Sequence, residues 1–343
     1  MRVQTLDITP QAPPGRADYL YANRHTQPDQ SSWRAVVRIL RSHISSHTHN
    51  VATDLVTTLF PGTCTLCDGP LNSLLPVPVC DSCLAAVEQV ALGQQDLPAC
   101  PCCGDSLPPD QLALEDIRFA TQLATALICR TCRLAPPDFE RVVSYATYDG
   151  ELRGLIGALK YNRMPRIARL LAPHLAQTIA RLQADAAPNL LAIAVPLFSS
   201  RERQRGYNQS ILLADEALRL LRKSHPHWQL TPAHNTLVRR RATESSLHLS
   251  TRQRRQNIRG AFQIPSNAKP LVAGKEILLI DDILTSGATA RECARVLRKA
   301  GATKVWVATL ARAQKFYARY RHEDPGEQVA TWDLFPKPPD NSL

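Results

Sequence analysis

The sequence predicts an α/β fold, in which helices cover both faces of a mostly parallel sheet, with a small cysteine-rich module in front of it. Short, continuous apolar runs such as Leu190–Val195 and Glu276–Ile280 predict the sheet, because strands covered on both faces have no polar side. Between these runs apolar residues recur every three or four positions, which indicates helices. The cysteines predict the module, since nine of the ten fall between Cys64 and Cys132.

The predicted α/β domain spans residues 140–315, and its strands and helices alternate along the chain. We expect strands at Arg141–Tyr148, Leu190–Val195, Glu276–Ile280 and Lys304–Leu310. We expect helices at Leu152–Leu159, Ile167–Leu182, Gln209–Leu221 and Thr289–Ala300. An alternation of this kind makes neighbouring strands parallel, with the helices crossing over the faces of the sheet.

Two flanking regions lack this periodicity. Residues 1–60 carry several prolines, and we expect a poorly ordered extension with one short amphipathic helix at Trp33–Ser42. Residues 323–343 contain four further prolines, and we expect a loose tail there.

The composition favours an acidic partner and a reducing compartment. Lys and Arg number 41 against 30 Asp and Glu, and 33 of the basic residues are arginine, whose planar fork of donors suits phosphate. A GC-rich genome would produce the same bias. The N-terminus has no apolar signal core, and the most apolar stretch, Leu190–Phe198, is about half as long as a membrane span. Together with the CxxC pairs, these features predict a cytoplasmic protein without a membrane span.

Four CxxC pairs predict two structural zinc sites within a module at residues 61–135. Each pair can supply two thiolates, and two pairs complete a closed tetrahedron around Zn2+. The simplest pairing joins the first pair to the second and the third to the fourth. An interleaved pairing stays open, as do redox-active or merely buried cysteines, and Cys102 could replace Cys100. The predicted ligands are Cys64, Cys67, Cys80, Cys83, Cys100, Cys103, Cys129 and Cys132.

One segment has the pattern of a ribose-5-phosphate site. An apolar strand runs into Asp281 and Asp282, and a turn of small polar residues follows before a helix begins. In a parallel sheet, ligands bind at the carboxyl ends of the strands, and the N–H groups of such a turn favour phosphate. The two carboxylates can accept hydrogen bonds from vicinal ribose hydroxyls. An Asp-rich turn that merely caps a helix is the alternative. The predicted phosphate cradle comprises Thr285, Ser286, Gly287, Ala288 and Thr289.

Two arginine clusters flank the same sheet. Arg201 and Arg205 precede a helix, and seven arginines against one acid lie between Arg239 and Arg259. They could bind pyrophosphate or a polynucleotide backbone, or they could form a solvated, ion-paired face. Lys160, at the end of a predicted helix, could likewise reach the pyrophosphate or remain solvated.

Taken together and in this order, the motifs resemble the ComF family. They are the CxxC pairs, LIGALKYNR at 155–163, VPLFSSRERQRGYNQS at 195–210, RRRATESSLHLSTRQRRQNIRGAF at 239–262 and ILLIDDILTSGAT at 277–289. The resemblance implies a type I phosphoribosyltransferase-like domain behind a zinc module. It also implies that phosphoribosyl pyrophosphate (PRPP) binds with Mg2+, with the ribose hydroxyls on Asp281 and Asp282 and the 5-phosphate on Thr285–Thr289. The family is linked to DNA uptake in natural competence.

The resemblance leaves three functions open. The protein could transfer a phosphoribosyl group to an unidentified acceptor, bind single-stranded DNA within the competence machinery without catalysis, or sense PRPP. One departure narrows the first: related enzymes that act on 6-oxopurines typically have Asp where this chain has Thr285, and Thr is a poor general base. We therefore do not expect hypoxanthine or guanine as the acceptor.

Overall fold

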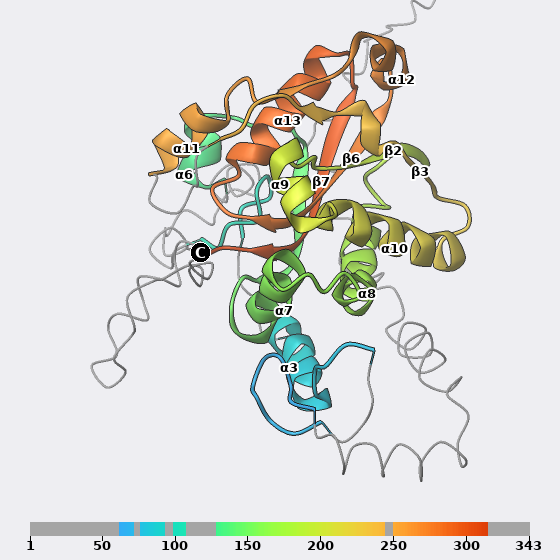
Figure 1. Ribbon diagram of the computed structural model, residues 1–343. Helices are drawn as coiled ribbons and strands as arrows, with labels where there is room; N and C mark the ends of the chain where they lie inside the picture. Colours follow the sequence, from blue (N-terminus) through green and yellow to red (C-terminus); the bar gives the residue numbers. More distant parts are fainter. Residues whose placement is uncertain (1–61, 72–75, 93–98, 108–127, 244–249, 315–343) are drawn as a thin grey trace, which may run out of the picture.

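The computed structural model describes residues 62–71, 76–92, 99–107, 128–243 and 250–314 (Figure 1). The predicted extension at 1–60, its helix at Trp33–Ser42 and the predicted tail at 323–343 lie outside the described residues.

A sheet of five parallel strands forms the centre of the molecule, which confirms the predicted fold class. Its strand order is β1-β7-β6-β2-β3, so that β6 and β7 are central and β3 is an edge. The strands are β1 (Arg141–Thr147), β2 (Asn189–Ala194), β3 (Gln229–Pro232), β6 (Glu276–Leu284) and β7 (Lys304–Arg312). A separate pair, β4 (Val238–Arg239) and β5 (Phe262–Gln263), is antiparallel.

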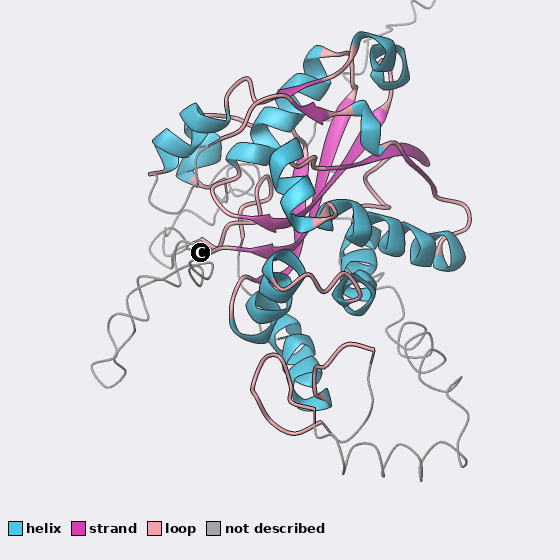
Figure 2. Ribbon diagram, in the orientation of Figure 1, coloured by secondary structure: helices cyan, strands magenta, loops and turns pink. Residues whose placement is uncertain are grey.

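Helices cover both faces of the sheet, as Figure 2 shows. Alternate residues of β6 point to opposite faces, so Leu278 and Ile280 lie in one hydrophobic core while Ile277 and Leu279 lie in the other. The first core is closed by α7 (Gly150–Tyr161), α8 (Ile167–Ala180) and α10 (Gln209–Ser224). The second is closed by α11 (Thr251–Ile258), α12 (Lys269–Val272) and α13 (Ala288–Lys299). Cys293 of α13 is fully buried in the second core, where it packs.

The cysteine-bearing segments divide between these two cores. Cys64 and Cys83, together with α3 (Asp81–Leu92), join the first core beside α7. The remaining pairs, Cys100–Cys103 and Cys129–Cys132, join the second core, where α6 (Arg130–Leu134) lies. Figure 1 shows α3 at one end of the molecule, well away from α6. The cysteine-rich region therefore contacts both faces of the sheet.

The main difference from the predicted elements concerns β6. It continues past Ile280 to Leu284, because β7 is long enough to pair with it as far as Arg312. The two acids thus lie within a paired strand and not beyond its end. The sequence did not predict β3, which is short and ends in Pro232; an edge position tolerates that proline. It also did not predict α9 (Ser199–Arg205), which carries the first arginine cluster.

Candidate functional site

The candidate site lies around Asp281 and Asp282, in the part of β6 that extends beyond its pairing with β2 but still pairs with β7. The side chain of Asp282 is 5% exposed, and its Oδ2 lies 2.9 Å from Nζ of Lys160. Asp281 Oδ1 accepts hydrogen bonds from Ser210 Oγ at 2.9 Å and from the backbone N–H of Asp282 at 2.9 Å. Two helices that follow different strands, α7 after β1 and α10 after β2, therefore converge on the acid pair of β6.

Asp281 has a raised proton affinity. Burial, and then the neighbouring charge of Asp282, raises the pKa of Asp281 to about 7, although Lys160 acts in the opposite direction. At neutral pH this carboxyl group is balanced between its two protonation states. It can therefore take or give a proton during binding, which an ordinary solvated aspartate does not do at that pH.

Lys160 lies in the last turn of α7, but its side chain does not extend into solvent. Its side chain is only 13% exposed and faces Asp282. Arg205 also acts on the acid pair: burial lowers its pKa, and the charge of Asp282 raises it. Its guanidinium lies 5.8 Å from the ring centroid of Tyr161 and donates to Gln209. Two of the predicted phosphate-binding cations, Lys160 and Arg205, therefore flank one carboxylate pair.

Arg239 is a further cation at this site. It lies over the Phe262 ring at 5.4 Å and donates to Thr243. Burial and then the charge of Arg201 lower its pKa, while Asp281 raises it. Arg201 itself is exposed on α9. Residues of the first arginine cluster and the first residue of the second cluster therefore place positive charge around the two acids.

The segment Thr285–Gly287, here called the phosphate loop, connects β6 to α13. Gly287 has a φ of +72° and stands directly before α13, where a side chain would be strained. A glycine cannot cap the helix with a side chain, and a Cβ placed there would meet nothing within 4 Å. The first turn of α13, with Ala288 and Thr289, therefore begins at an open space, which suits an anion at a helix N-terminus.

The eight predicted cysteine ligands form two groups with the simplest pairing. The first cluster is Cys64, Cys67, Cys80 and Cys83, and the second cluster is Cys100, Cys103, Cys129 and Cys132; within each, all Sγ atoms lie within 4.8 Å of one another. Four sulfurs about 2.3 Å from a tetrahedral metal would be about 3.8 Å apart. The separations of Cys64–Cys83 (3.9 Å), Cys67–Cys80 (3.7 Å) and Cys103–Cys129 (3.7 Å) agree with this geometry. Both clusters could hold a metal ion, and Cys102 belongs to neither.

Comparison with known proteins supports this description. The sequence model of the phosphoribosyl transferase domain family matches residues 209–340. The DNA utilization protein YhgH of Salmonella typhimurium is 33% identical over 255 residues, which cover 74% of this chain and 97% of that protein. The chain belongs to the ComF family. Its relatives include competence protein F of Haemophilus influenzae, 32% identical over 54% of this chain and 78% of that protein. Competence protein ComFC of Bacillus subtilis is 25% identical over 68% of this chain and 84% of that protein.

A solved structure was compared with this ComF-family chain, and the helices of the chain were compared with the length of a membrane span. The solved structure of the allosteric regulatory enzyme of purine biosynthesis aligns with 41% of this chain and 25% of its own length, at 22% identity and a TM-score of 0.24, a likeness too slight to bear on function. Within the described ranges, none of the helices has the length and apolar character needed to cross a bilayer.

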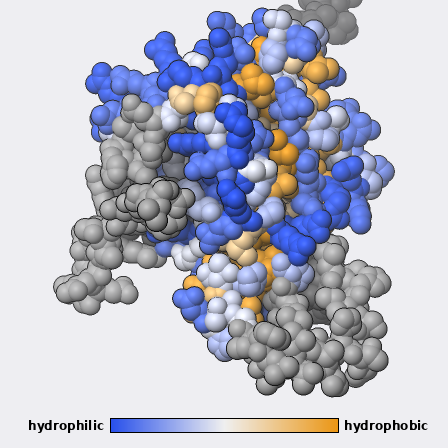
Figure 3. Space-filling model, in the orientation of Figure 1, coloured by the Kyte–Doolittle hydropathy of each residue, from blue (hydrophilic) through white to orange (hydrophobic). Residues whose placement is uncertain are grey.

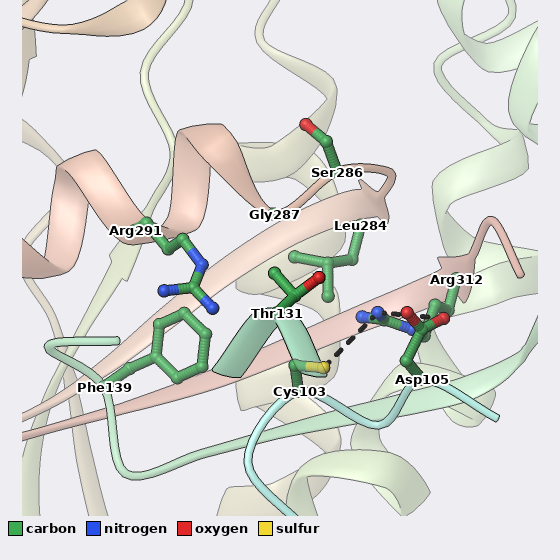
Figure 4. A pocket seen from close by; sticks show the side chains of 9 residues that line it. All are labelled: Cys103, Asp105, Thr131, Phe139, Leu284, Ser286, Gly287, Arg291 and Arg312. Carbon is green, nitrogen blue, oxygen red and sulfur yellow. Dashed lines mark hydrogen bonds and ion pairs between the residues drawn. The ribbon is translucent and has the colours of Figure 1, made fainter. Parts of the chain in front are cut away.

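The second cluster of this ComF-family chain lies against the phosphate loop. A small pocket there is lined by Cys103, Asp105, Thr131, Phe139, Leu284, Ser286, Gly287, Arg291 and Arg312 (Figure 4). Arg291, on α13, donates to Cys132 Sγ at 3.2 Å and to the carbonyl of Ala135 at 2.6 Å. Arg312, at the end of β7, donates to Cys103 Sγ at 3.6 Å and pairs with Asp105 at 3.2 Å.

Sequence reasoning missed Ser210, Arg291 and Arg312 as site residues. Ser210 stands in a helix start, where a serine usually caps the helix, but Asn208 is the cap and accepts from the Ser210 N–H at 2.9 Å. Its hydroxyl is therefore free to donate to Asp281. The two arginines carry no local signal, because their sulfur partners lie far away in the sequence.

Proposed function

We propose that this site binds PRPP together with Mg2+. The observation that carries the proposal is the acid pair, with Asp281 half-buried and Asp282 buried, on the strand that leads into an open, glycine-capped helix N-terminus. In this arrangement the phosphate loop and the first turn of α13 receive the 5-phosphate, and Asp281 and Asp282 accept hydrogen bonds from the ribose hydroxyls. Lys160, Arg201 and Arg205 face the pyrophosphate. Mg2+ would neutralise the pyrophosphate and orient it.

The Lys160–Asp282 ion pair gives this proposal a specific consequence. In the structure Lys160 compensates the charge of Asp282 at 2.9 Å. When ribose hydroxyls donate to Asp282, the ammonium group can turn to the pyrophosphate without leaving a buried carboxylate unpartnered. The same lysine would therefore stabilise the empty site and the bound ligand.

Calorimetric titration with PRPP and Mg2+ tests the proposal on the full chain. Asp282→Asn should weaken binding by roughly 10- to 100-fold, because hydrogen bonds to a charged group contribute about 1.5–3 kcal/mol. Asp185→Asn is the matched control, since Asp185 lies in an exposed ion pair with Arg141 and should leave the affinity unchanged. The absence of PRPP binding to the wild-type protein would refute the proposal.

The raised pKa of Asp281 adds a second readout. Because its carboxylate must accept hydrogen bonds from the ligand, PRPP affinity should rise as the pH increases through about 7. Ser210→Ala removes a hydrogen bond that lowers this pKa, so the pH midpoint should move upward. A midpoint unchanged in this variant would contradict the role of Asp281 as the titrating group.

Transfer of the phosphoribosyl group is the reaction that such a complex supports. A nucleophilic acceptor would bond to C1 of the ribose while pyrophosphate leaves with the bonding electrons. Release of pyrophosphate, measured with nucleobases and with single-stranded DNA as acceptors, distinguishes an enzyme from a PRPP sensor. Release that depends on one acceptor supports catalysis. Binding without release under every acceptor supports a sensor.

DNA binding is a second candidate, favoured by the names of the relatives and by the surface of the protein. Figure 3 shows a strongly hydrophilic face over α9 and α11. Arg203 of α9 and Arg252 of α11 are exposed, as is Arg240, which follows β4. Such a face can bind the phosphate backbone of single-stranded DNA during DNA uptake.

A gel shift at several salt concentrations tests this surface. Arg240→Glu with Arg252→Glu should weaken binding and reduce its salt dependence, whereas Arg222→Glu, on the exposed side of α10, should not. Arg241 is unsuitable for the test, because it donates to the carbonyls of Asn257 and Arg259 and thereby anchors α11. Equal DNA affinity in all variants would exclude this face.

We further propose that both cysteine clusters hold structural zinc. Four thiolates at tetrahedral spacing form a closed zinc site without an open position for a substrate. Such thiolates require a reducing compartment, so we also propose a cytoplasmic location. Elemental analysis should find two zinc ions per chain; a single ion or iron would contradict the assignment.

A further inference from the structure

We propose that metal occupancy of the second cluster and ligand occupancy of the phosphate loop are thermodynamically linked through Arg291 and Arg312. The inference rests on the proposed function, since it requires a ligand on the loop. It concerns two positioning residues that belong to the α/β domain but donate hydrogen bonds to cysteine sulfurs.

Arg312 connects the cluster to the beginning of the phosphate loop. It lies opposite Leu284 in the pairing of β6 with β7, and Leu284 is the last residue before the loop. The next residue, Ala313, donates its N–H to the carbonyl of Leu284 at 2.9 Å. In Figure 4 the Arg312 side chain reaches toward Cys103 and Asp105. The backbone that supports the start of the loop therefore carries a guanidinium that faces the second cluster.

Arg291 connects the cluster to the end of the loop. Its N–H donates to the carbonyl of Gly287 at 2.9 Å, so it closes the first turn of α13. Its side chain donates to Cys132 Sγ at 3.2 Å and lies 5.8 Å from the Phe139 ring centroid. Both ends of the phosphate loop are thus held by arginines whose side chains donate to ligands of the same cluster.

The charges explain why a bound metal would matter to these arginines. Four thiolates around a divalent ion carry a net charge of −2, and two guanidinium groups balance it. Arg312 is 5% exposed, and its Nε and Nη1 have no hydrogen-bond partner among the described residues. Its buried charge therefore depends on Cys103 and Asp105. Without a metal to hold the four sulfurs in one tetrahedron, the arginines lose a fixed anionic partner, and the loop loses the anchors at both of its ends.

The first cluster provides an internal control. Its Cys64 Sγ accepts from the backbone N–H groups of Leu66 and Cys80, each at 3.4 Å, and these donors belong to its own turns. Among the described residues, the sulfurs of the first cluster are hydrogen-bonded to backbone N–H groups and to one another, not to arginine. Linkage is therefore expected for one cluster and not for the other.

Cadmium-113 NMR of the full chain tests the inference, since cadmium in place of zinc gives one resonance for each four-cysteine cluster. Addition of PRPP with Mg2+ should shift the resonance of the second cluster, and leave that of the first in place. Metal transfer to a chelator should slow roughly tenfold for the second cluster only. Reciprocally, protein depleted of that metal should bind PRPP more weakly.

Variants assign the effect to the two arginines. Arg312→Gln and Arg291→Gln should each abolish most of the PRPP effect on metal release. Arg295→Gln is the matched control, because Arg295 lies one turn further along α13 and pairs with Glu292 instead of a cysteine. If a glutamine variant does not fold, the two wild-type resonances still decide the question.

The outcomes separate this inference from the proposed function. If PRPP does not bind at all, the proposed function fails. If PRPP binds but neither resonance shifts and neither release rate changes, or if both clusters respond equally, the linkage is overturned while PRPP binding stands.

Discussion

The first and second clusters share a set of four cysteines but differ in what surrounds them. In the first cluster, Cys64 Sγ accepts hydrogen bonds from backbone groups of the cluster's own turns, and Cys67 is exposed. All four cysteines of the second cluster are buried, and two of their sulfurs accept from Arg291 and Arg312. The first cluster is therefore locally complete, whereas the second is completed by side chains from the α/β domain.

The two clusters also support different sides of the candidate site. The first packs against α7 through Leu66, which contacts Gly154, and α7 ends with the lysine that pairs with Asp282. The second lies against the phosphate loop. The cysteine-rich region therefore packs against the α/β domain on two sides of the candidate site, with one cluster on each side.

Loss of a metal ligand should show this difference most strongly. Cys132→Ser should lower the free energy of unfolding by roughly 3–5 kcal/mol, because it disrupts a buried charged cluster and removes a partner of Arg291. Cys67→Ser, at an exposed ligand, should lower it by less, about 1–2 kcal/mol. Denaturant unfolding followed by circular dichroism measures both values.

Cys102→Ser is the control for these two variants, since Cys102 is half-buried and outside both clusters. It should change the free energy of unfolding by less than about 1 kcal/mol. If Cys132→Ser and Cys67→Ser lowered the free energy of unfolding equally, the proposed difference between the clusters would be contradicted, because the arginines would then add nothing to the stability of the second cluster.

The sequence was informative wherever the relevant physics is local. Apolar runs predicted β2 and most of β6 and β7, since strands covered on both faces must be apolar. The turn that precedes α13 could be predicted as well, because small residues before a helix are a local pattern, whereas its binding of phosphate stays a prediction. The spacing of the CxxC pairs likewise favoured the pairing that the structure has.

The sequence did not predict contacts between residues that lie far apart along the chain. Two adjacent acids looked like the end of a strand, because carboxylates are rarely buried without a partner. Asp282 is buried within β6 because Lys160, from a distant helix, compensates its charge. Arg291 and Arg312 looked like ordinary helix and strand residues for the same reason, since only the fold brings cysteine sulfurs to them.

Acid should weaken the first core through a half-buried histidine. His174, on α8, lies 4.5 Å from Tyr145 between ring centroids, and Tyr145 donates to the carbonyl of Val87 on α3 at 3.5 Å. Burial lowers the pKa of His174 to about 4 from 6.5. The unfolded chain therefore binds a proton before the folded protein does. Stability should be intact above pH 6.5 and fall by roughly 3 kcal/mol as the pH drops to about 4.

Urea unfolding at pH 7 and pH 5, with wild type and His174→Phe, isolates this effect. Protonation of cysteines is common to both proteins and cancels in the difference between them. The phenylalanine variant should lose less stability at pH 5 than wild type, and an equal loss would show that His174 does not sensitise the first core to acid. His227→Phe, at an exposed histidine, should behave as wild type does.

The smallest expected effect tests how the first cluster is joined to α7. Gly154 and Gly157 lie in the same helix, but a Cβ at Gly154 would meet Leu66 Cδ2 at 2.6 Å, whereas one at Gly157 would meet nothing within 4 Å. Gly157→Ala should stabilise the protein by about 0.5–1 kcal/mol, the usual gain of alanine over glycine in a helix. Gly154→Ala should lack that gain and destabilise the protein by about 1 kcal/mol, because Leu66 must move.

Gly154→Ala should also speed metal release from the first cluster while release from the second cluster is unaffected. If both alanines stabilise the protein equally and release stays unchanged, Leu66 is not the contact through which the first cluster supports the Lys160 helix.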